Sequence, residues 1–140
     1  MALRGRKPED IQERLKFFVY GPAKVGKTTL ACQFPKPYII DTERGAENDK
    51  CKELLTNNGE CLFHTLDYDE MYKEILALMT EKHPFKTLVI DSITWIYDAL
   101  VLKYQKDLQR KNPSSKSFYG RDRELANHRM RELMWLLLRS

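Results

Sequence analysis

Short apolar runs alternate along this chain with longer stretches in which apolar residues recur at helical spacing. Four runs predict buried strands, because each is brief, rich in aliphatic or aromatic residues and bounded by polar residues, glycine or proline. They span residues 15–20, 38–41, 61–65 and 87–91. The stretches between and after them predict helices at residues 27–34, 46–57, 68–82, 93–110 and from 122 to the end, with Asp67 as N-cap of the third. This alternation predicts an α/β fold with a mainly parallel sheet flanked by helices.

The composition is that of one soluble globular domain. Of the 140 residues, 42% are hydrophobic and 31% are charged. No apolar run approaches the ~18 residues of a membrane-spanning helix, so we expect no membrane partner. The cysteines Cys32, Cys51 and Cys61 show no CxxC spacing. Their number and spacing favour free thiols in a reducing cytoplasm over a disulfide framework or a zinc site.

The strongest chemical signal is a P-loop, the pattern G-x-x-x-x-G-K-[ST] between a predicted strand and a predicted helix. It comprises Gly21, Pro22, Ala23, Lys24, Val25, Gly26, Lys27 and Thr28. The two glycines allow backbone angles that turn successive N–H groups inward around an anion. The segment therefore predicts binding of a nucleoside triphosphate, with the Lys27 ammonium at the β- and γ-phosphates and the Thr28 hydroxyl on Mg²⁺.

Asp91 is predicted to form the second half of this site. It ends the apolar run 87–91, so its carboxylate lies at the carboxyl edge of the sheet, where ligands of parallel α/β folds bind. A carboxylate in this position holds Mg²⁺ directly or through water. The alternative is an ordinary helix N-cap, since Asp91 also precedes a predicted helix.

Glu43 is a candidate base for hydrolysis. It lies two residues beyond Asp41 at the end of the second predicted strand. Hydrolysis needs a group near the γ-phosphate that orients or deprotonates the attacking water. The alternative is a surface glutamate paired with Arg44.

Three segments together resemble the Walker A, catalytic-glutamate and Walker B segments of RecA-like ATPases. They are Gly21–Thr29, Asp41–Ala46 and Leu88–Ser92, and they occur in the same order and at similar separations as in that family. The combination looks especially like the compact RecA-like ATPases of bacteriophages, some of which are single-strand annealing or recombination proteins.

The resemblance implies a RecA-like P-loop NTPase core with ATP and Mg²⁺ as cofactors. Phosphate binding would extend to Thr29, Lys27 and Glu43 would act in catalysis, and Thr28 and Asp91 would serve Mg²⁺. It also implies a homo-oligomer in the full-length protein, because RecA-like sites are commonly completed across a subunit interface. A phage-encoded protein of this kind would work in the cytoplasm of the bacterial host.

The positive charge is concentrated near the C-terminal end. Residues 1–100 carry 14 basic and 16 acidic side chains, whereas residues 101–140 carry 10 basic and 4 acidic ones. Such asymmetry indicates an anionic partner, although a solvated helix face has a similar composition.

The segment 110–121 lies where the RecA family has its first DNA-contacting loop. Its basic and aromatic side chains suit the phosphates and bases of single-stranded DNA. The candidate contacts are Lys111, Lys116, Phe118, Tyr119 and Arg121. The alternative is a solvated loop whose aromatic side chains pack on the domain.

The chain ends in an apolar helical run, residues 133–138, with no glycine cap and no following strand. A helix that is apolar nearly all round is expected to be buried on several sides. RecA-like proteins continue with a strand between the P-loop and Walker B strands. We therefore expect residues 1–14 to be a basic extension and residues 15–140 to be an incomplete RecA-like domain that lacks its C-terminal strands.

The leading functional hypothesis is an ATPase coupled to single-stranded DNA binding in phage recombination or replication. We expect the isolated 140 residues to hydrolyse ATP weakly or not at all. One alternative is a P-loop kinase for a small molecule, with 110–123 as an arginine-rich lid, although Glu43 suits this poorly. Another is a nucleotide-gated DNA-binding or assembly module with little turnover. The P-loop contacts phosphates and does not distinguish ATP from GTP.

Overall fold

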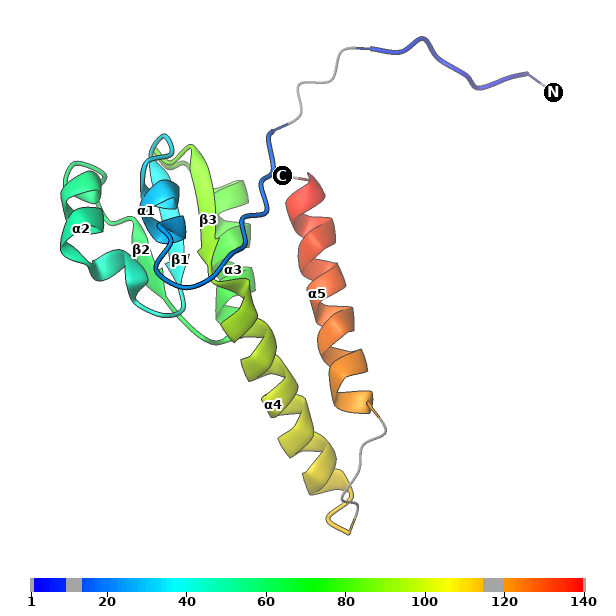
Figure 1. Cartoon of the computed structure of the whole chain (residues 1–140). Helices are drawn as coiled ribbons and strands as arrows, with labels where there is room; N and C mark the ends of the chain where they lie inside the picture. Colours follow the sequence, from blue (N-terminus) through cyan, green and yellow to red (C-terminus); the bar gives the residue numbers. More distant parts are fainter. Residues whose placement is uncertain (1, 10–13, 115–119, 140) are drawn as a thin grey trace.

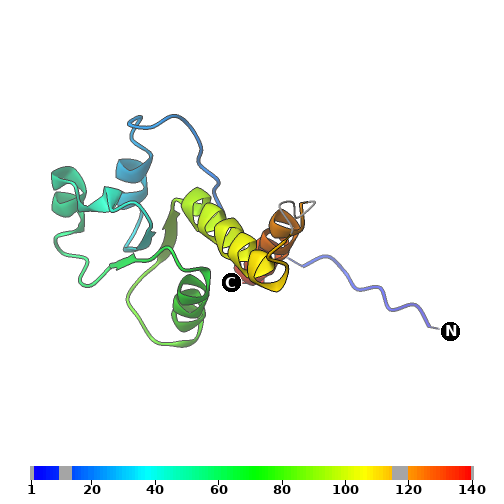
Figure 2. The same cartoon turned by 90° about the horizontal axis from the view of Figure 1, so that it is seen from below.

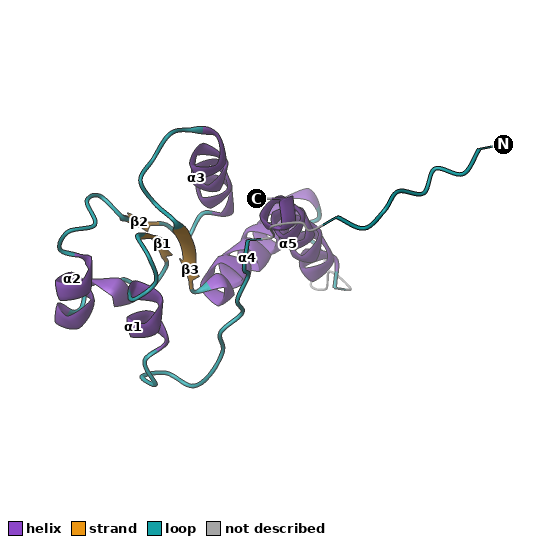
Figure 3. Ribbon diagram, turned by 90° about the horizontal axis from the view of Figure 1, so that it is seen from above, coloured by secondary structure: helices purple, strands orange, loops and turns teal. Residues whose placement is uncertain are grey.

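The computed structural model describes residues 2–9, 14–114 and 120–139. Its centre is a three-stranded parallel sheet in the order β2-β1-β3, formed by β1 (Pro37–Asp41), β2 (Leu62–His64) and β3 (Thr87–Asp91). Helices lie on both faces of this sheet (Figure 1 and Figure 3). The predicted α/β class and parallel pairing are therefore confirmed.

The central strand β1 divides the core into two layers. Ile39 packs with cysteines of α1 (Lys27–Cys32) and α2 (Asp49–Leu55). Tyr38 and Ile40 belong to the other layer, which contains buried side chains of α3 (Tyr68–Thr80), α4 (Ile93–Lys111) and α5 (Arg121–Arg139). Successive side chains of a strand point to opposite faces, so a strand covered on both sides is apolar throughout.

The helices α4 and α5 form a long antiparallel pair that extends beyond the sheet (Figure 1 and Figure 2). Gln105 Nε2 on α4 donates to Asp122 Oδ2 on α5 at 2.8 Å. Closer to the sheet, Tyr68 Oη on α3 donates to the Arg129 carbonyl of α5 at 2.6 Å. These bonds fix α5 along one side of α4 and against the start of α3.

Most predicted elements are confirmed, with shifted ends. The strand 87–91 and the Asp67 cap, which accepts from Glu70 N at 3.0 Å, agree with the structure. The helix expected at 46–57 is two elements, a 3-10 helix η1 (Gly45–Glu47) and α2. Asn48 separates them because its side chain caps α2 by accepting from Cys51 N at 2.9 Å.

The strand predicted at residues 15–20 is wrong. Residues 14–20 have no regular secondary structure, and Phe18 is 79% exposed. A strand needs a neighbour to pair its N–H and C=O groups. Among the described residues the sheet ends at β3, and segment 14–20 is hydrogen-bonded to none of its strands.

The C-terminal helix is buried on one side and exposed on the other, contrary to the burial on several sides predicted from its composition. Leu133 is fully buried, whereas Trp135 is 63% exposed and Met134 and Leu138 are also exposed. The reason is that α5 packs along α4 with one face. None of the described helices is both long and apolar enough to cross a membrane.

All three cysteines are buried free thiols in the layer between the sheet and helices α1 and α2. Burial, with a hydrogen bond to Cys51, raises the pKa of the Cys32 thiol to about 12. Its thiol therefore stays protonated at neutral pH and packs as a small apolar side chain.

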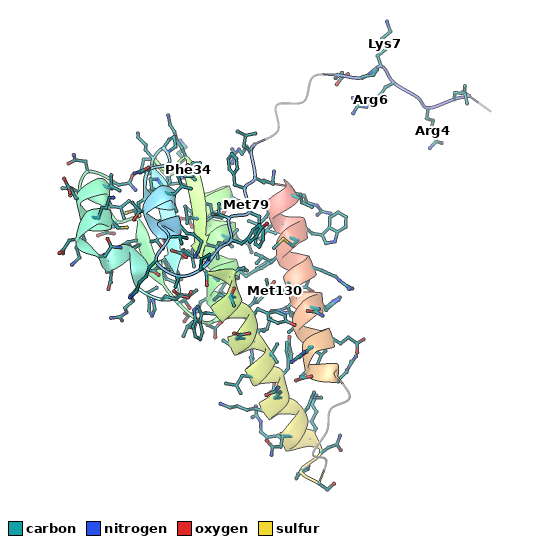
Figure 4. All side chains as sticks on the ribbon, in the orientation of Figure 1. Arg4, Arg6, Lys7, Phe34, Met79 and Met130 are labelled. Atoms are coloured by element: carbon teal, nitrogen blue, oxygen red, sulfur yellow. The ribbon has the colours of Figure 1, made fainter. Side chains whose placement is uncertain are left out.

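Residues 2–9 have no regular secondary structure and are exposed. Figure 4 shows Arg4, Arg6 and Lys7 on this segment, which points away from the sheet and the helices.

Candidate functional site

The candidate site lies at the carboxyl edge of the sheet, where the strand ends meet the start of α1. The parallel register places Asp41 at the end of β1 beside His64 on β2 and Asp91 on β3. His64 Nδ1 donates to the Asp41 carbonyl at 2.7 Å. This edge is the usual ligand position of an open parallel sheet.

The loop from Gly21 to Gly26 is exposed and leads directly into α1. Gly26 is the N-cap of α1 and has φ 99°, a left-handed angle that glycine adopts without a steric penalty. A Cβ at this position would meet no atom within 4 Å. The requirement for glycine therefore comes from the backbone angle and not from crowding.

The Lys27 side chain folds back over this loop. Its Nζ donates to the Gly21 carbonyl at 2.8 Å and to the Pro22 carbonyl at 2.6 Å. These two bonds hold the ammonium group beside the loop backbone, at the start of α1. An anion bound in the loop would therefore meet a positive charge that is already in place.

Thr28 and Asp91, the two residues expected to bind Mg²⁺, are in direct contact. Thr28 Oγ1 donates to Asp91 Oδ2 at 2.6 Å, and both side chains are partly buried. A hydroxyl and a carboxylate oxygen are hard ligands of the kind that Mg²⁺ prefers, and this ion usually completes its shell with water and phosphate oxygens. The donor set therefore suits Mg²⁺.

Glu43 is exposed just past the end of β1. Its Oε1 accepts from Ser92 Oγ at 3.4 Å, so the end of β3 contacts the carboxylate. Arg44, the next residue, has a left-handed backbone with φ 57° and begins the turn into η1. The structure thus brings Glu43 to the edge that also carries Thr28 and Asp91.

Sequence reasoning did not identify the groups that shape this edge. The Asp41 carboxylate is buried and accepts from the backbone N–H groups of Glu43 at 3.1 Å and Ala46 at 3.2 Å. These bonds fold the chain sharply after β1. Thr42 is also buried and is hydrogen-bonded to the end of β3. The signal available in the sequence was a pair of short polar residues, Asp41 and Thr42, where an apolar strand ends.

Of the five residues predicted to contact DNA, the structure describes two, Lys111 and Arg121, and they lie at the far end of α4 from this edge. Lys116, Phe118 and Tyr119 are outside the described residues. Lys111 ends α4, and Arg121 begins α5, where it pairs with Glu124 at 3.1 Å. Both are exposed at the tip of the α4–α5 pair, far from the sheet (Figure 1).

Comparison with known families agrees with this geometry. Residues 13–139 match the model of a family described as an AAA domain. The chain belongs to the AAA domain family. AAA domains are P-loop NTPases, so membership implies nucleotide binding, typically with Mg²⁺.

One curated relative of this AAA domain is the DNA repair and recombination protein RadB of Thermococcus sibiricus. The two are 34% identical over 54% of this chain and 40% of the relative. The chain thus spans less than half the length of that protein, to which it is distantly similar. No solved structure matches the chain.

Proposed function

We propose that this AAA domain binds ATP with Mg²⁺ at the loop Gly21–Thr29 and that the full-length protein hydrolyses it. The observation that carries the proposal is the contact of Thr28 with Asp91 beside that loop. A threonine hydroxyl at the start of the P-loop helix and an aspartate at the end of a neighbouring strand are the two protein groups that hold Mg²⁺ in P-loop NTPases.

The residue roles follow from this arrangement. The backbone of residues 21–29 would surround the phosphates, and Lys27 would exchange its bonds to the Gly21 and Pro22 carbonyls for phosphate oxygens. Thr28 and Asp91 would hold Mg²⁺, which neutralises charge on the phosphates when bound.

Glu43 would act on the water that attacks the γ-phosphorus. The water oxygen bonds to phosphorus, the bond to the ADP oxygen breaks, and the water proton passes to the Glu43 carboxylate or out through it to solvent. The exposed position of Glu43 at the sheet edge leaves its carboxylate accessible to such a water. Its contact with Ser92 orients the carboxylate.

We further propose that nucleotide turnover is coupled to single-stranded DNA, which the tip of the α4–α5 pair would contact. The proposed contacts are Lys111, Lys116, Phe118, Tyr119 and Arg121. Support comes from the positive charge of residues 101–140 and from the recombination protein to which the chain is similar. The cationic side chains would neutralise phosphates, and the aromatic ones would stack on bases.

The remaining parts of the proposal concern organisation and setting. Residues 15–140 would form the RecA-like domain and residues 1–14 a basic extension, which the family match from residue 13 supports. A homo-oligomer and a role in bacteriophage recombination or replication, inside a bacterial host, rest on the resemblance of the three site segments.

The test is the rate of ATP hydrolysis by the full-length protein with and without single-stranded DNA, with a Lys27→Ala variant as control. Stimulation by DNA in the parent but not in the variant supports the proposal. A slow rate that DNA does not change, together with salt-sensitive DNA binding, would indicate a nucleotide-gated module. Stimulation by a nucleoside or a sugar would indicate a kinase and would refute the proposal.

A further inference from the structure

Thr42 connects the ends of the two strands that carry the acidic groups of the site. Its side chain is only 5% exposed. Its Oγ1 accepts from Ser92 N at 2.9 Å and lies within donating distance of the Asp91 carbonyl, at 3.3 Å, and the Ser92 carbonyl, at 3.2 Å. Its backbone N–H also donates to the Asp91 carbonyl at 2.9 Å. Every one of these bonds runs from the end of β1 to the end of β3.

These bonds begin where the sheet ladder stops. The register between β1 and β3 ends with the pair Asp41 and Asp91. Beyond this pair, the chain after β1 turns into η1 and the chain after β3 turns into α4, so the regular pairing of the two strands ends here. The next connections both come from Thr42: its backbone N–H donates to the Asp91 carbonyl, and its hydroxyl binds the peptide N–H that directly follows Asp91.

The hydrogen bonds of Thr42 involve the backbone next to both acidic side chains of the site, Asp91 and Glu43. On the β3 side, Asp91 Oδ2 accepts from Thr28 of the P-loop helix. Glu43 follows β1, and its carboxylate accepts from the Ser92 hydroxyl. The backbone N–H of the same Ser92 donates to Thr42. The direction of a side chain depends on the backbone that carries it, so the Thr42–Ser92 bond affects where Asp91 and Glu43 point.

We propose that Thr42 is a positioning residue that sets the Asp91 carboxylate for Mg²⁺ by holding the end of β3 against the end of β1. This inference rests on the proposed function, because it concerns how the same site holds its metal. Thr42 is not among the residues proposed to bind the nucleotide or Mg²⁺, yet the metal-dependent part of nucleotide affinity would depend on its hydroxyl. The phosphate contacts of the P-loop do not depend on it, since no bond joins Thr42 to residues 21–27 among those of the described chain.

The test separates metal-dependent from metal-independent binding. Binding of mant-ATP, a fluorescent ATP analogue, is titrated in excess Mg²⁺ and again in EDTA, and the ratio of the two dissociation constants gives the gain from the metal. Thr42→Val and Thr42→Ala both remove the hydroxyl, and either one that folds decides the question. Thr42→Ser keeps the hydroxyl and should restore the gain.

Thr87→Val is the matched control, because Thr87 lies at the other end of β3 and its hydroxyl also joins two segments, donating to the Pro35 carbonyl at 2.8 Å. We expect loss of the Thr42 hydroxyl to reduce the gain from Mg²⁺ about tenfold, the size of one lost hydrogen bond to a polar network. Affinity in EDTA should stay within about twofold of the parent, and Thr87→Val should keep the full gain.

Two results would overturn the inference. One is a full gain from Mg²⁺ in a folded Thr42→Val or Thr42→Ala variant. The other is an equal loss of affinity in Mg²⁺ and in EDTA, which would show a general effect on the fold. Failure of the proposed function would give a different pattern of results. Lys27→Ala would then bind mant-ATP in EDTA as tightly as the parent does, and Asp91→Asn would keep the gain in affinity from Mg²⁺.

Discussion

Thr28 Oγ1 donates a 2.6 Å hydrogen bond to Asp91 Oδ2, and this bond joins the first turn of α1 to the end of β3. The two residues are 63 positions apart in the chain. Their contact depends on the parallel sheet, which brings the end of β3 to the edge where α1 begins, directly after the P-loop. It places two oxygen ligands suited to Mg²⁺ beside a loop suited to phosphate.

Replacing Asp91 by Asn should weaken nucleotide binding only when Mg²⁺ is present. An amide keeps the size of the side chain but loses the negative charge that attracts the metal. We expect the dissociation constant for ATP in Mg²⁺ to rise at least about tenfold, or about 1.4 kcal/mol. The value in EDTA should stay unchanged, as isothermal titration can show. Asp98→Asn, on the exposed surface of α4, is the control and should bind like the parent. Equal losses with and without the metal would contradict the assignment.

Replacing Glu43 by Gln should lower turnover in the full-length protein while nucleotide binding is kept. The amide cannot take a proton from water, and general base groups contribute about 10²-fold or more to a rate. The measurement is steady-state ATP hydrolysis beside mant-ATP binding. Glu47→Gln, four residues on in the exposed part of η1, should hydrolyse at the parent rate. A Glu43→Gln variant with full turnover would exclude Glu43 as the base.

The pairing of α4 with α5 should depend on acid pH through Asp122. Two hydrogen bonds hold the pKa of the Asp122 carboxyl below its usual range. The larger effect comes from the Gln105 side chain and the smaller one from the Arg123 backbone. A lowered folded-state pKa means that this contribution is complete above the ordinary value of 3.8 and is lost as the pH falls through the folded value. We expect the urea midpoint of the parent to fall more between pH 6 and pH 3 than that of Asp122→Asn. Equal falls would show that Asp122 does not contribute.

The two sides of α5 should respond differently to truncation. Leu133 is fully buried in the core shared with α3 and α4, so Leu133→Ala should cost about 2–5 kcal/mol of unfolding free energy. Trp135 lies on the exposed side, and Trp135→Ala should cost less than about 1 kcal/mol. Urea unfolding followed by circular dichroism gives both values. Similar costs would mean that α5 is buried on both sides in solution.

The strands show how far the fold could be predicted. Residues 87–91 and residues 15–20 carry the same signal, a short apolar run next to a polar residue or glycine. The first run forms β3 because β1 pairs with it, whereas the second has no partner strand among the described residues. Local patterns report the propensity of a segment, but a strand exists only where a second segment supplies its hydrogen bonds.

The site shows the same division between local and spatial information. The P-loop and Asp91 were predicted because each has a fixed pattern in its own segment. The role of Thr42 was not predicted, since its partners Asp91 and Ser92 are about fifty positions away and meet it only through the β1–β3 register. Nothing in the run 41–46 alone indicates that its one hydroxyl, that of Thr42, reaches the neighbouring strand.

The central claim, that Gly21–Thr29 binds ATP with Mg²⁺, is tested most directly by calorimetric titration of the chain with MgATP. We expect saturable binding at one site per chain. Lys27→Ala should weaken this binding by about 10- to 100-fold, the range for lost hydrogen bonds to charged groups. Lys52→Ala, on the exposed surface of α2, should bind like the parent. Absence of binding by the folded parent, or equal affinity in the parent and Lys27→Ala, would show that Gly21–Thr29 is not the ATP site.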